Sequence, residues 1–422
     1  MSEAHITTPI GESRDSSLRL IDWFDSDRVR AANTLVVGAG AIGNEVLKNL
    51  AMLGVGNIFV FDKDVVEISN LTRSILFSPS DVNQPKALVA SRAVKRINPE
   101  VVARWNSGDI LCDLGLGVVR RMDVIVAGLD NVRARLRLNE MCLRVGRPWI
   151  EAGIGVLNGD VCVYLPDRGA CYECYTQPES LDFGLACNRL ASRYESEGRV
   201  PTTPTIASII GGVQAQEALK LLHPETWEGR TLASRRFVFN GTSVETLMVN
   251  LTRRADCPQH GARLTPLVEA RDLSAAGTTV GDLIGRATEL LGSEPTLELN
   301  FVLALGLECE CDSPDAIMRP LDKLYAEDLS CEKCGFRPTH AAAVSLTEKI
   351  NRRVLEEYPT LRDYALADIG VPPLDIVRAS GSRRQRLAEG EGGGSDSWTY
   401  VLSAVDIELT GDERRDLHFS EA

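Results

Sequence analysis

A glycine-rich run, Gly38-Ala-Gly-Ala-Ile-Gly43, constrains the fold of this chain more than any other segment. It follows the apolar run 34–37, which is typical of a buried strand, and precedes a helix-like segment that reaches about Leu53. Glycines at these positions let the backbone approach a phosphate closely at the start of the helix, where free N–H groups and the helix dipole favour an anion. Gly38, Gly40 and Gly43 therefore predict a phosphate-binding turn between a strand and a helix.

The alternation of strands and helices continues to about residue 150, which is the pattern of a parallel sheet with crossover helices. The sequence predicts, in order, strand 58–62, helix 86–97, strands 101–105 and 123–127, helix 131–145 and strand 149–152. A helix at 206–222 and strands at 236–239 and 246–250 follow. This order predicts an α/β fold with a doubly wound, Rossmann-like domain.

The length of 422 residues exceeds that of one ordinary domain. A polar stretch rich in alanine and glycine near residues 260–275 is typical of a linker. We therefore expect one domain over residues 1–265 and a smaller α+β domain over residues 275–422. For the second domain the sequence predicts helices at 280–291 and 342–358, strands at 296–307 and 374–378, and a flexible linker or hairpin tip at 389–397.

The charge balance excludes two classes of partner. Lysine plus arginine number 46 against 59 aspartate plus glutamate, which argues against binding to nucleic acid or to an anionic membrane. No apolar window is long enough for a transmembrane helix, and residues 1–17 lack the basic flank and apolar core of a signal peptide. We expect a cytoplasmic location, where the eleven cysteines indicate metal ligands or reactive thiols rather than disulfides.

Polar and charged residues follow successive elements of the predicted sheet. Asp62 ends the second strand, where a carboxylate can accept a hydrogen bond from a ribose hydroxyl. The others are Asn70, Arg73, Lys86, Asp130 and Asn131. Arginine and lysine stabilise charge on phosphoryl oxygens, and an aspartate can hold Mg²⁺ on a leaving pyrophosphate. A site for a nicotinamide dinucleotide does not need this combination of amides, cations and an acid. The sequence therefore favours an enzyme that catalyses substitution at the α-phosphorus of ATP over a dehydrogenase.

Four motifs occur in a specific order along residues 14–260. They are Gly-Ala-Gly-Ala-Ile-Gly-Asn-Glu-Val-Leu-Lys-Asn-Leu-Ala, Asp-Lys-Asp-Val-Val-Glu-Ile-Ser-Asn-Leu-Thr-Arg, Asn-Gln-Pro-Lys-Ala and Leu-Asp-Asn. Together they resemble the adenylation domain of ubiquitin-activating enzymes and of their bacterial ThiF/MoeB-like, sulfur-carrier-activating relatives. The resemblance implies that the C-terminal glycine carboxylate of a ubiquitin-like protein attacks the α-phosphate of ATP, giving an acyl-adenylate and pyrophosphate. It also implies a homodimer.

The same resemblance assigns roles to individual residues. It implies that Asp62 contacts the ribose of ATP, that Asn70, Arg73 and Lys86 contact its phosphates, and that Asp130 binds Mg²⁺. The family usually has Arg-x-x-Arg before the first strand, and its second arginine reaches the partner subunit's nucleotide. Here Arg14 fits the first position and Ser17 occupies the second, so Arg19 is the remaining candidate.

Two pairs of candidate metal ligands flank the middle of the chain, Cys171-Tyr-Glu-Cys174 and Cys257-Pro-Gln-His260. Each pair can place two donors on one turn around a tetrahedral Zn²⁺. The spacing alone leaves a redox Cys-x-x-Cys open. The resemblance favours zinc, since relatives hold a structural zinc with two Cys-x-x-Cys pairs around this region, and His260 would replace the last cysteine.

A second candidate zinc site, of the ribbon type, lies in the smaller predicted domain. Its ligands would be Cys309, Cys311, Cys331 and Cys334, in the pairs Cys-Glu-Cys and Cys-Glu-Lys-Cys. Scattered reduced thiols are the alternative interpretation.

Of the remaining cysteines, Cys112, Cys142 and Cys162 lie in apolar or alternating segments, where a small buried side chain is expected. Cys187 lies in a polar segment with several arginines, shortly before the helix near Pro201. Positive charge and a helix N-terminus both favour the thiolate, the form that attacks. By resemblance, this crossover segment carries the thiol that receives the activated protein as a thioester, so we expect Cys187 to be the nucleophile.

The whole chain more loosely resembles activating enzymes of bacterial ubiquitin-like conjugation operons, some of which act in phage defence. The features that carry this likeness are the activating domain, the cysteine-rich ribbon and the segment Gly-Val-Pro-Pro-Leu-Asp-Ile-Val at 370–377. It implies that the smaller domain recruits the ubiquitin-like protein or a conjugating-enzyme-like protein. Sulfur transfer that gives a carrier thiocarboxylate, and a catalytically inactive scaffold that binds a ubiquitin-like partner, are the alternatives.

Overall fold

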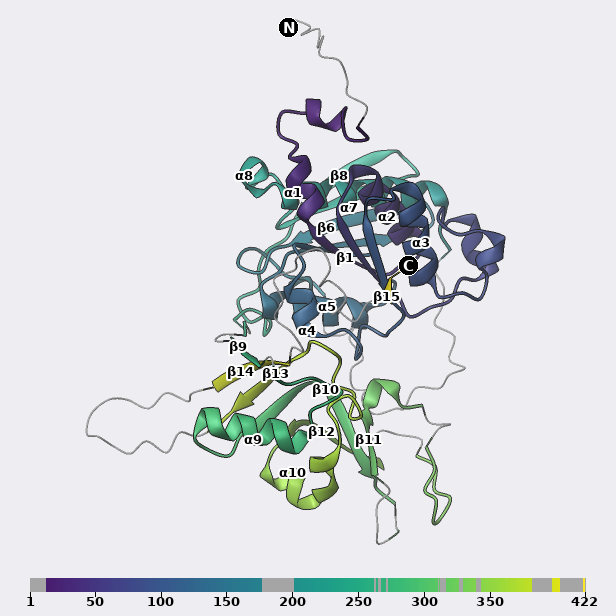
Figure 1. Ribbon diagram of the computed structural model, residues 1–422. Helices are drawn as coiled ribbons and strands as arrows, with labels where there is room; N and C mark the ends of the chain where they lie inside the picture. The colour runs from purple at the N-terminus through teal and green to yellow at the C-terminus, as the bar shows by residue number, and fades with distance from the viewer. Residues whose placement is uncertain are drawn as a thin grey trace, which may run out of the picture.

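The computed structural model describes residues 13–176, 201–261, 263–264, 267–270, 272–309, 311, 316–325, 329–338, 343–381, 397–402 and 420–421. These residues form two sheets, a larger one of nine strands and a smaller one of six. Figure 1 shows the larger sheet with its helices above the smaller one. None of the helices in this described part of the chain is both long and apolar enough to cross a membrane.

The larger sheet contains the predicted strands, with bounds that differ by a few residues at most. Its strands are β1 (Asn33–Val37), β2 (Asn57–Phe61), β3 (Val102–Asn106), β4 (Val124–Ala127), β5 (Trp149–Ile154), β6 (Asn158–Tyr164), β7 (Arg235–Asn240), β8 (Glu245–Asn250) and β15 (Ser420–Glu421). The helices around it are η1 (Leu18–Leu20), α1 (Ser26–Ala31), α2 (Ala41–Leu53), η2 (Ile68–Thr72), η3 (Pro79–Asp81), α3 (Lys86–Ile97), α4 (Leu116–Arg120), α5 (Val132–Val145), η4 (Tyr172–Cys174), α7 (Pro204–Leu222) and α8 (Pro224–Trp227).

The strand order of the larger sheet is β15-β3-β2-β1-β4-β5-β6-β7-β8. Strands β3, β2, β1, β4 and β5 are parallel, whereas β6, β7, β8 and β15 each pair antiparallel. The chain passes from β1 to β2 on one side and later to β4 on the other, so the strand order reverses at β1. In open α/β sheets, ligands bind at the carboxyl ends of the strands beside such a switch point.

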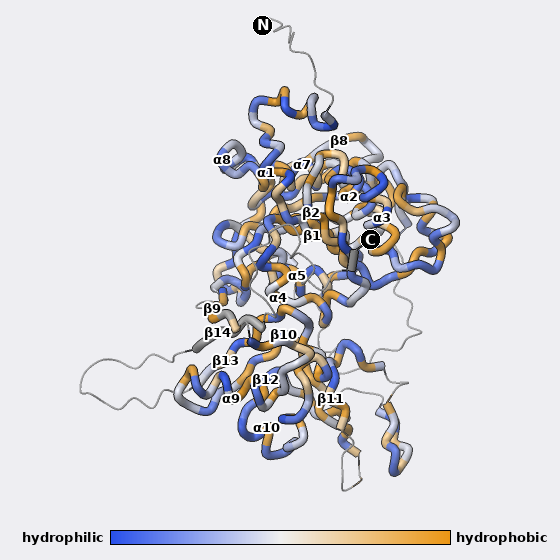
Figure 2. The backbone as a smooth tube through the Cα atoms, viewed as in Figure 1, coloured by the Kyte–Doolittle hydropathy of each residue, from blue (hydrophilic) through white to orange (hydrophobic). Residues whose placement is uncertain are grey.

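Both faces of the central parallel strands β1, β2 and β4 are buried. Val36 and Val60 pack with α2, α3 and α7 on one face, and Leu35, Phe59 and Ile125 pack with α4 and α5 on the other. Figure 2 shows apolar residues gathered along β1 and β2 inside the molecule. A strand that is buried on both faces has apolar residues at nearly every position. Its sequence is therefore a continuous apolar run, which can be recognised without the structure.

The smaller sheet has the order β11-β10-β13-β14-β9, and β12 also pairs with β10. Its elements are β9 (Leu267–Ala270), α9 (Val280–Leu291), β10 (Thr296–Leu307), β11 (Ala316–Pro320), η6 (Leu321–Lys323), β12 (Val344–Ile350), α10 (Arg352–Glu357), η9 (Pro359–Asp363), β13 (Ile376–Ser380) and β14 (Ser397–Leu402). Strand β9 lies inside the stretch 260–275 that composition marks as a linker. Most of the predicted linker or hairpin tip at 389–397 lies outside the described residues.

The predicted helix 342–358 is wrong over most of its length. Residues 344–350 form β12, which pairs antiparallel with β10, and only 352–357 are helical. Val344 and Ile350 are buried at the ends of β12, and the residues between them are mostly exposed. Pairing with a distant strand overrode the local helical preference of this segment, and Asn351, whose side chain accepts from the Val354 N–H, starts α10 afterwards.

The two sheets meet where α4 and α5 lie between them (Figure 1). The backbone N–H of Gly117 donates to the Leu374 carbonyl at 2.8 Å, and that of Leu116 donates to Asp375 Oδ1 at 2.9 Å. A Cβ on Gly117 would lie 2.3 Å from the Leu374 oxygen, so only glycine allows this approach. Leu374 and Ile376 complete the core beneath α4 and α5.

Candidate nucleotide and metal sites

Gly38 closes the turn after β1 against the end of β4. Its φ of +92° lies in the left-handed region, and a Cβ there would lie 2.6 Å from the Gly128 carbonyl oxygen. The Gly38 N–H donates to the Phe61 carbonyl, and the Gly128 N–H donates to the Val37 carbonyl, both at 2.8 Å. The ends of β1, β2 and β4 are therefore joined at the switch point.

Gly40 and Gly43 meet opposite surroundings. A Cβ on Gly43 would lie 1.9 Å from the Gly38 oxygen, whereas a Cβ on Gly40 would have no described atom outside its own neighbourhood within 4 Å. Gly40 is the N-cap of α2, and within the described residues no side chain caps this helix. The space beside Gly40 at the start of α2 is therefore open, and free N–H groups at a helix start with such space can bind a phosphate.

Asp62 holds the glycine turn from the end of β2. Its Oδ2 accepts from the Ala39 N–H at 2.6 Å and its Oδ1 accepts from the Asp64 N–H at 2.8 Å. Burial raises the pKa of Asp62, an effect that the Lys86 charge and the Ala39 N–H partly offset. Each carboxylate oxygen retains acceptor capacity beyond its backbone bond, so a ribose hydroxyl can still donate to Asp62.

Lys86 lies beside Asp62 at the start of α3. Its ammonium is 2.8 Å from Asp64 Oδ2, and its side chain is only 12% exposed. The structure therefore brings Lys86 and Asp62 to the same edge of the sheet, as the sequence predicts. A lysine held this way can place its charge on a phosphoryl oxygen without first becoming ordered.

Asn70 and Arg73 lie in the η2 loop that follows β2. Asn70 Oδ1 accepts from the Glu67 N–H at 2.9 Å, and Arg73 donates to the Ser69 carbonyl at 2.7 Å. These bonds stay within the loop, and among the described contacts none joins the two side chains to the glycine turn. Direct contact of Asn70 and Arg73 with phosphates stays a prediction.

Asn44, which the sequence reasoning missed, connects this loop to the glycine turn. Its Nδ2 donates to the Ala39 and Gly40 carbonyls at 2.7 and 3.0 Å, and its Oδ1 accepts from the Leu76 N–H at 2.8 Å. The side chain is fully buried. An amide among the apolar residues of α2 was the available signal, since a buried amide must find partners.

Asp130 and Asn131 follow β4 at the same edge. Asn131 Oδ1 accepts from the Ala134 N–H at 2.7 Å and so caps α5, while the Asp130 side chain is exposed beside it. Arg135 donates to the Leu129 carbonyl at 2.6 Å and pairs with Glu151 at 2.9 Å, which fixes the loop from behind. The Asp130 carboxylate is thus accessible and can bind Mg²⁺.

Glu151 is buried beneath that loop, and burial raises its pKa from 4.5 to about 7, although the Arg135 charge opposes the rise. The folded state therefore binds an extra proton between pH 4.5 and about 7, and stability falls as the pH rises through this range. The compared quantity is the free energy of unfolding of wild type minus that of Glu151→Gln. We expect this difference to fall by about 3 kcal/mol as the pH rises from 4.5 to about 7. Denaturant unfolding at several pH values measures this. A constant difference would contradict it, and Glu140→Gln, on α5, is the matched control.

The first candidate metal cluster is assembled as predicted. The Cys171 Sγ lies 3.7 Å from that of Cys174 and 3.6 Å from that of Cys257, and His260 Nε2 lies 3.1 Å from the Cys174 Sγ. Sulfur ligands of a tetrahedral Zn²⁺ with bonds of about 2.3 Å are about 3.8 Å apart. Four converging donors fit a metal better than a redox pair does, so the residues can hold Zn²⁺.

The second cluster has the same character. Its donor atoms all lie within 4.8 Å of one another, with Cys331 Sγ 3.5 Å from the Cys309 Sγ and 3.9 Å from the Cys311 Sγ. The turn at Cys331–Gly335 is closed by the Gly335 N–H, which donates to the Cys331 carbonyl at 2.9 Å. This arrangement also fits Zn²⁺, with Cys334 as the exposed fourth ligand.

The three cysteines expected in the core are buried there. Burial raises the pKa of Cys162 to about 12 and also raises the pKa values of Cys112 and Cys142. Such thiols are poor nucleophiles at neutral pH. Cys187 lies outside the described residues, between η4 and α7, so its role stays a prediction.

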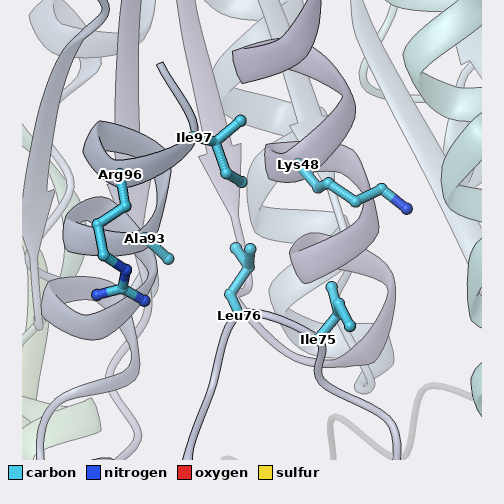
Figure 3. A pocket seen from close by; sticks show the side chains of 6 residues that line it. All are labelled: Lys48, Ile75, Leu76, Ala93, Arg96 and Ile97. Atoms are coloured by element: carbon cyan, nitrogen blue, oxygen red, sulfur yellow. The ribbon is translucent and has the colours of Figure 1, made fainter. Parts of the chain in front are cut away.

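A hollow lies between α2, α3 and the loop at Ile75 and Leu76 (Figure 3). It is lined by Lys48, Ile75, Leu76, Ala93, Arg96 and Ile97. None of the predicted site residues lines it, so we assign it no part in the nucleotide site.

A model described as the ThiF family matches residues 13–259 of the chain. The SAMP-activating enzyme E1 of Haloferax volcanii is 32% identical over 234 residues, which cover 56% of this chain and 82% of that protein. The sulfur carrier protein adenylyltransferase of Thermus thermophilus is 28% identical over 246 residues, covering 56% and 84%.

One similar protein is much longer than this chain, and a solved structure shares the fold. SUMO-activating enzyme subunit 2 of Dictyostelium discoideum is 37% identical over 149 residues, but the match covers only 35% of this chain and 22% of that protein. Among solved structures, Escherichia coli MccB with ATP matches with a TM-score of 0.50 and 23% identity, covering 60% of this chain and 75% of that one. That likeness shows the fold of the larger sheet.

Proposed function

The chain belongs to the ThiF family, and on that premise we propose that it is an ATP-dependent adenylyltransferase that activates the C-terminal glycine carboxylate of a ubiquitin-like protein. The observation that carries this proposal is the carboxyl edge of β1, β2 and β4. There the open start of α2, the Asp62 carboxylate and the Lys86 ammonium meet.

In the proposed reaction a carboxylate oxygen of the glycine bonds to the α-phosphorus, the bond from that phosphorus to the bridging oxygen breaks, and pyrophosphate leaves with the electron pair. Asp62 would hold the ribose, while Lys86 and Arg73 would stabilise charge on the phosphoryl oxygens. Asp130 would hold Mg²⁺, which neutralises charge on the leaving pyrophosphate. Asn70 would also contact the phosphates, and Asn131, which caps α5, would belong to the nucleotide site beside Asp130.

We further propose a second step on Cys187. Its thiolate would attack the acyl carbon of the adenylate, the bond to AMP would break, and the protein would pass as a thioester to a conjugating-enzyme-like protein. We also propose that both four-residue clusters bind Zn²⁺ and that the protein forms a homodimer. We propose that the chain divides into an adenylation domain, residues 1–265, and a partner-binding domain, residues 275–422. On the looser resemblance, the pathway would be a bacterial ubiquitin-like conjugation system, acting in the cytoplasm and in some cases against phage.

One observation favours a second candidate function. The chain covers 84% of the Thermus protein named a sulfur carrier protein adenylyltransferase. In that case the adenylate would be converted to a thiocarboxylate, with no transfer to a conjugating enzyme. The adenylation step and its residues would be unchanged.

Pyrophosphate exchange tests the adenylation step. With a glycine-terminated ubiquitin-like partner, we expect labelled pyrophosphate to enter ATP, and the exchange to fall sharply in Lys86→Ala and Asp130→Ala. A partner that binds the protein but supports no exchange would sink the proposed activity. Omitting the partner is the control for exchange that does not depend on the partner's glycine carboxylate.

A covalent adduct distinguishes the two products. We expect wild type to form a covalent adduct with the partner that dithiothreitol cleaves. Cys187→Ser should no longer form this thioester, whereas Cys162→Ser should still form it. Electrophoresis without reductant measures it. If both variants still form the adduct, Cys187 is excluded as the nucleophile. Release of a thiocarboxylate product would favour the second function.

A further inference from the structure

The short helix η6 belongs to the smaller sheet domain but contacts two loops of the larger one. Asp322 pairs with Arg133 in the first turn of α5, and the Lys323 ammonium lies 2.6 Å from Asp113 Oδ1, in the loop after β3. These loops follow β4 and β3, and β1 and β2 lie between those strands in the sheet. Two adjacent residues thus join the loops on either side of the candidate nucleotide site.

The α5 side of this bridge reaches the proposed magnesium ligand. Arg133 lies two residues beyond Asn131, whose side chain caps α5 and stands next to Asp130. Asp322 is only 13% exposed, and burial raises its pKa while the Arg133 charge lowers it. The Asp322 carboxylate, being largely buried, is stabilised when Arg133 stays beside it. The ion pair therefore holds the start of α5 in one position.

The β3 side of the bridge reaches the proposed ribose ligand. Asp113 uses its Oδ2 to accept from the Asp109 N–H at 2.9 Å, while its Oδ1 faces Lys323. Asp109 in turn pairs with Lys63 at 2.9 Å, and Lys63 directly follows Asp62. Lys323 therefore holds a carboxylate that fixes the backbone of Asp109, the partner of Lys63.

The four-cysteine cluster fixes η6 at its other end. Leu321 and Leu324, which flank the two charged residues, pack in the small apolar core that contains Cys331, Cys309 and Cys311. The Leu324 N–H closes η6 by donating to the Leu321 carbonyl at 3.0 Å. The position of η6 therefore depends on that cluster being formed.

We propose that Asp322 and Lys323 are positioning residues, through which the smaller domain and the metal state of its four-cysteine cluster set the affinity of the nucleotide site for ATP. This inference rests on the proposed function. Two loops already held by η6 lose less conformational entropy when ATP binds than free loops do, so the bridge strengthens binding without touching the ligand.

Direct titration of the full-length protein with ATP and Mg²⁺ tests the bridge. We expect Asp322→Ala and Lys323→Ala each to weaken ATP binding about fivefold. Exchanging the charges in Asp322→Arg with Arg133→Asp should restore most of the affinity, which loss of an unrelated structural contact would not allow. The matched control is Lys349→Ala, which removes an exposed ion pair with Glu298 elsewhere in the same domain and should leave ATP binding unchanged.

A cysteine variant tests the metal link. Cys334→Ser should lower the bound zinc and weaken ATP binding to a similar extent, and combining it with Asp322→Ala should add little, because both act on η6. Wild-type affinity for ATP in the Asp322 and Lys323 variants would overturn the proposed bridge. If the losses of ATP affinity in Cys334→Ser and Asp322→Ala multiply in the double variant, the proposed link to the metal cluster would be overturned. A wild-type protein that binds no ATP would instead overturn the proposed function, and this inference with it.

Discussion

Gly43→Ala is expected to lower the free energy of unfolding by about 3 kcal/mol and to abolish ATP binding. The new Cβ would lie 1.9 Å from the Gly38 carbonyl oxygen and 2.9 Å from its carbon. Both are backbone atoms, so no rotamer change relieves the clash, and the turn that joins β1 to α2 must open. Denaturant unfolding and ATP titration measure the two effects.

Gly40→Ala provides the contrast. Its Cβ would meet no described atom within 4 Å, so we expect the fold to keep its wild-type stability. The methyl group would stand at the open start of α2, where a phosphate must approach, so ATP binding should weaken nevertheless. Wild-type stability in Gly43→Ala, or unimpaired ATP binding in Gly40→Ala, would contradict the arrangement of this turn.

Loss of a ligand from the first metal cluster should have a comparably large effect. Cys257→Ser is expected to release one zinc per chain and to lower the free energy of unfolding by several kcal/mol, since binding of a structural zinc contributes directly to folding. The cluster joins the Cys171–Cys174 turn to Cys257, which lies 86 positions after Cys171, and the Tyr172 N–H donates to Asn139 of α5 at 3.0 Å. Elemental analysis and denaturant unfolding measure these effects.

Cys112→Ala is the matched control for the metal prediction, because Cys112 is equally buried but lies in neither cluster. It should keep the full metal content while losing some packing energy. Unchanged zinc in Cys257→Ser would show that the four donors do not bind a metal together. A chelator that unfolds wild type should have a smaller additional effect on Cys257→Ser.

The larger domain could be predicted because its information is local. Strands β1, β2 and β4 are buried on both faces and carry apolar runs. The glycine turn and Asp62 lie at the ends of such strands, and Lys86 lies at the start of α3. Helix α9 has the predicted bounds, because Thr279 and Asp282 form a capping box at its start. Each cysteine pair could be recognised as a pair of candidate ligands because its members are close in sequence, whereas the meeting of Cys171 and Cys174 with Cys257 and His260 was expected only from the resemblance.

The remainder depends on contacts between distant residues. Strand β12 became a strand through pairing with β10, which no local pattern announces. Asn44 and Glu151 act on loops far from them in sequence, and the charges of Asp322 and Lys323 resemble those of any exposed turn until Arg133 and Asp113 are seen beside them. Cys187 could be proposed only from the residues around it and from resemblance.

The pairing of β9 with β14 has a consequence for synthesis of the chain. β9 precedes its partner β14 by about 130 residues and pairs parallel with it, in the register Leu267 with Thr399. The smaller sheet therefore cannot close until β14 has left the ribosome, whereas strands β1 to β5 can assemble well before. Until then the edges of β9 and β13 remain unpaired, and we expect this interval to be when the nascent protein most needs a chaperone.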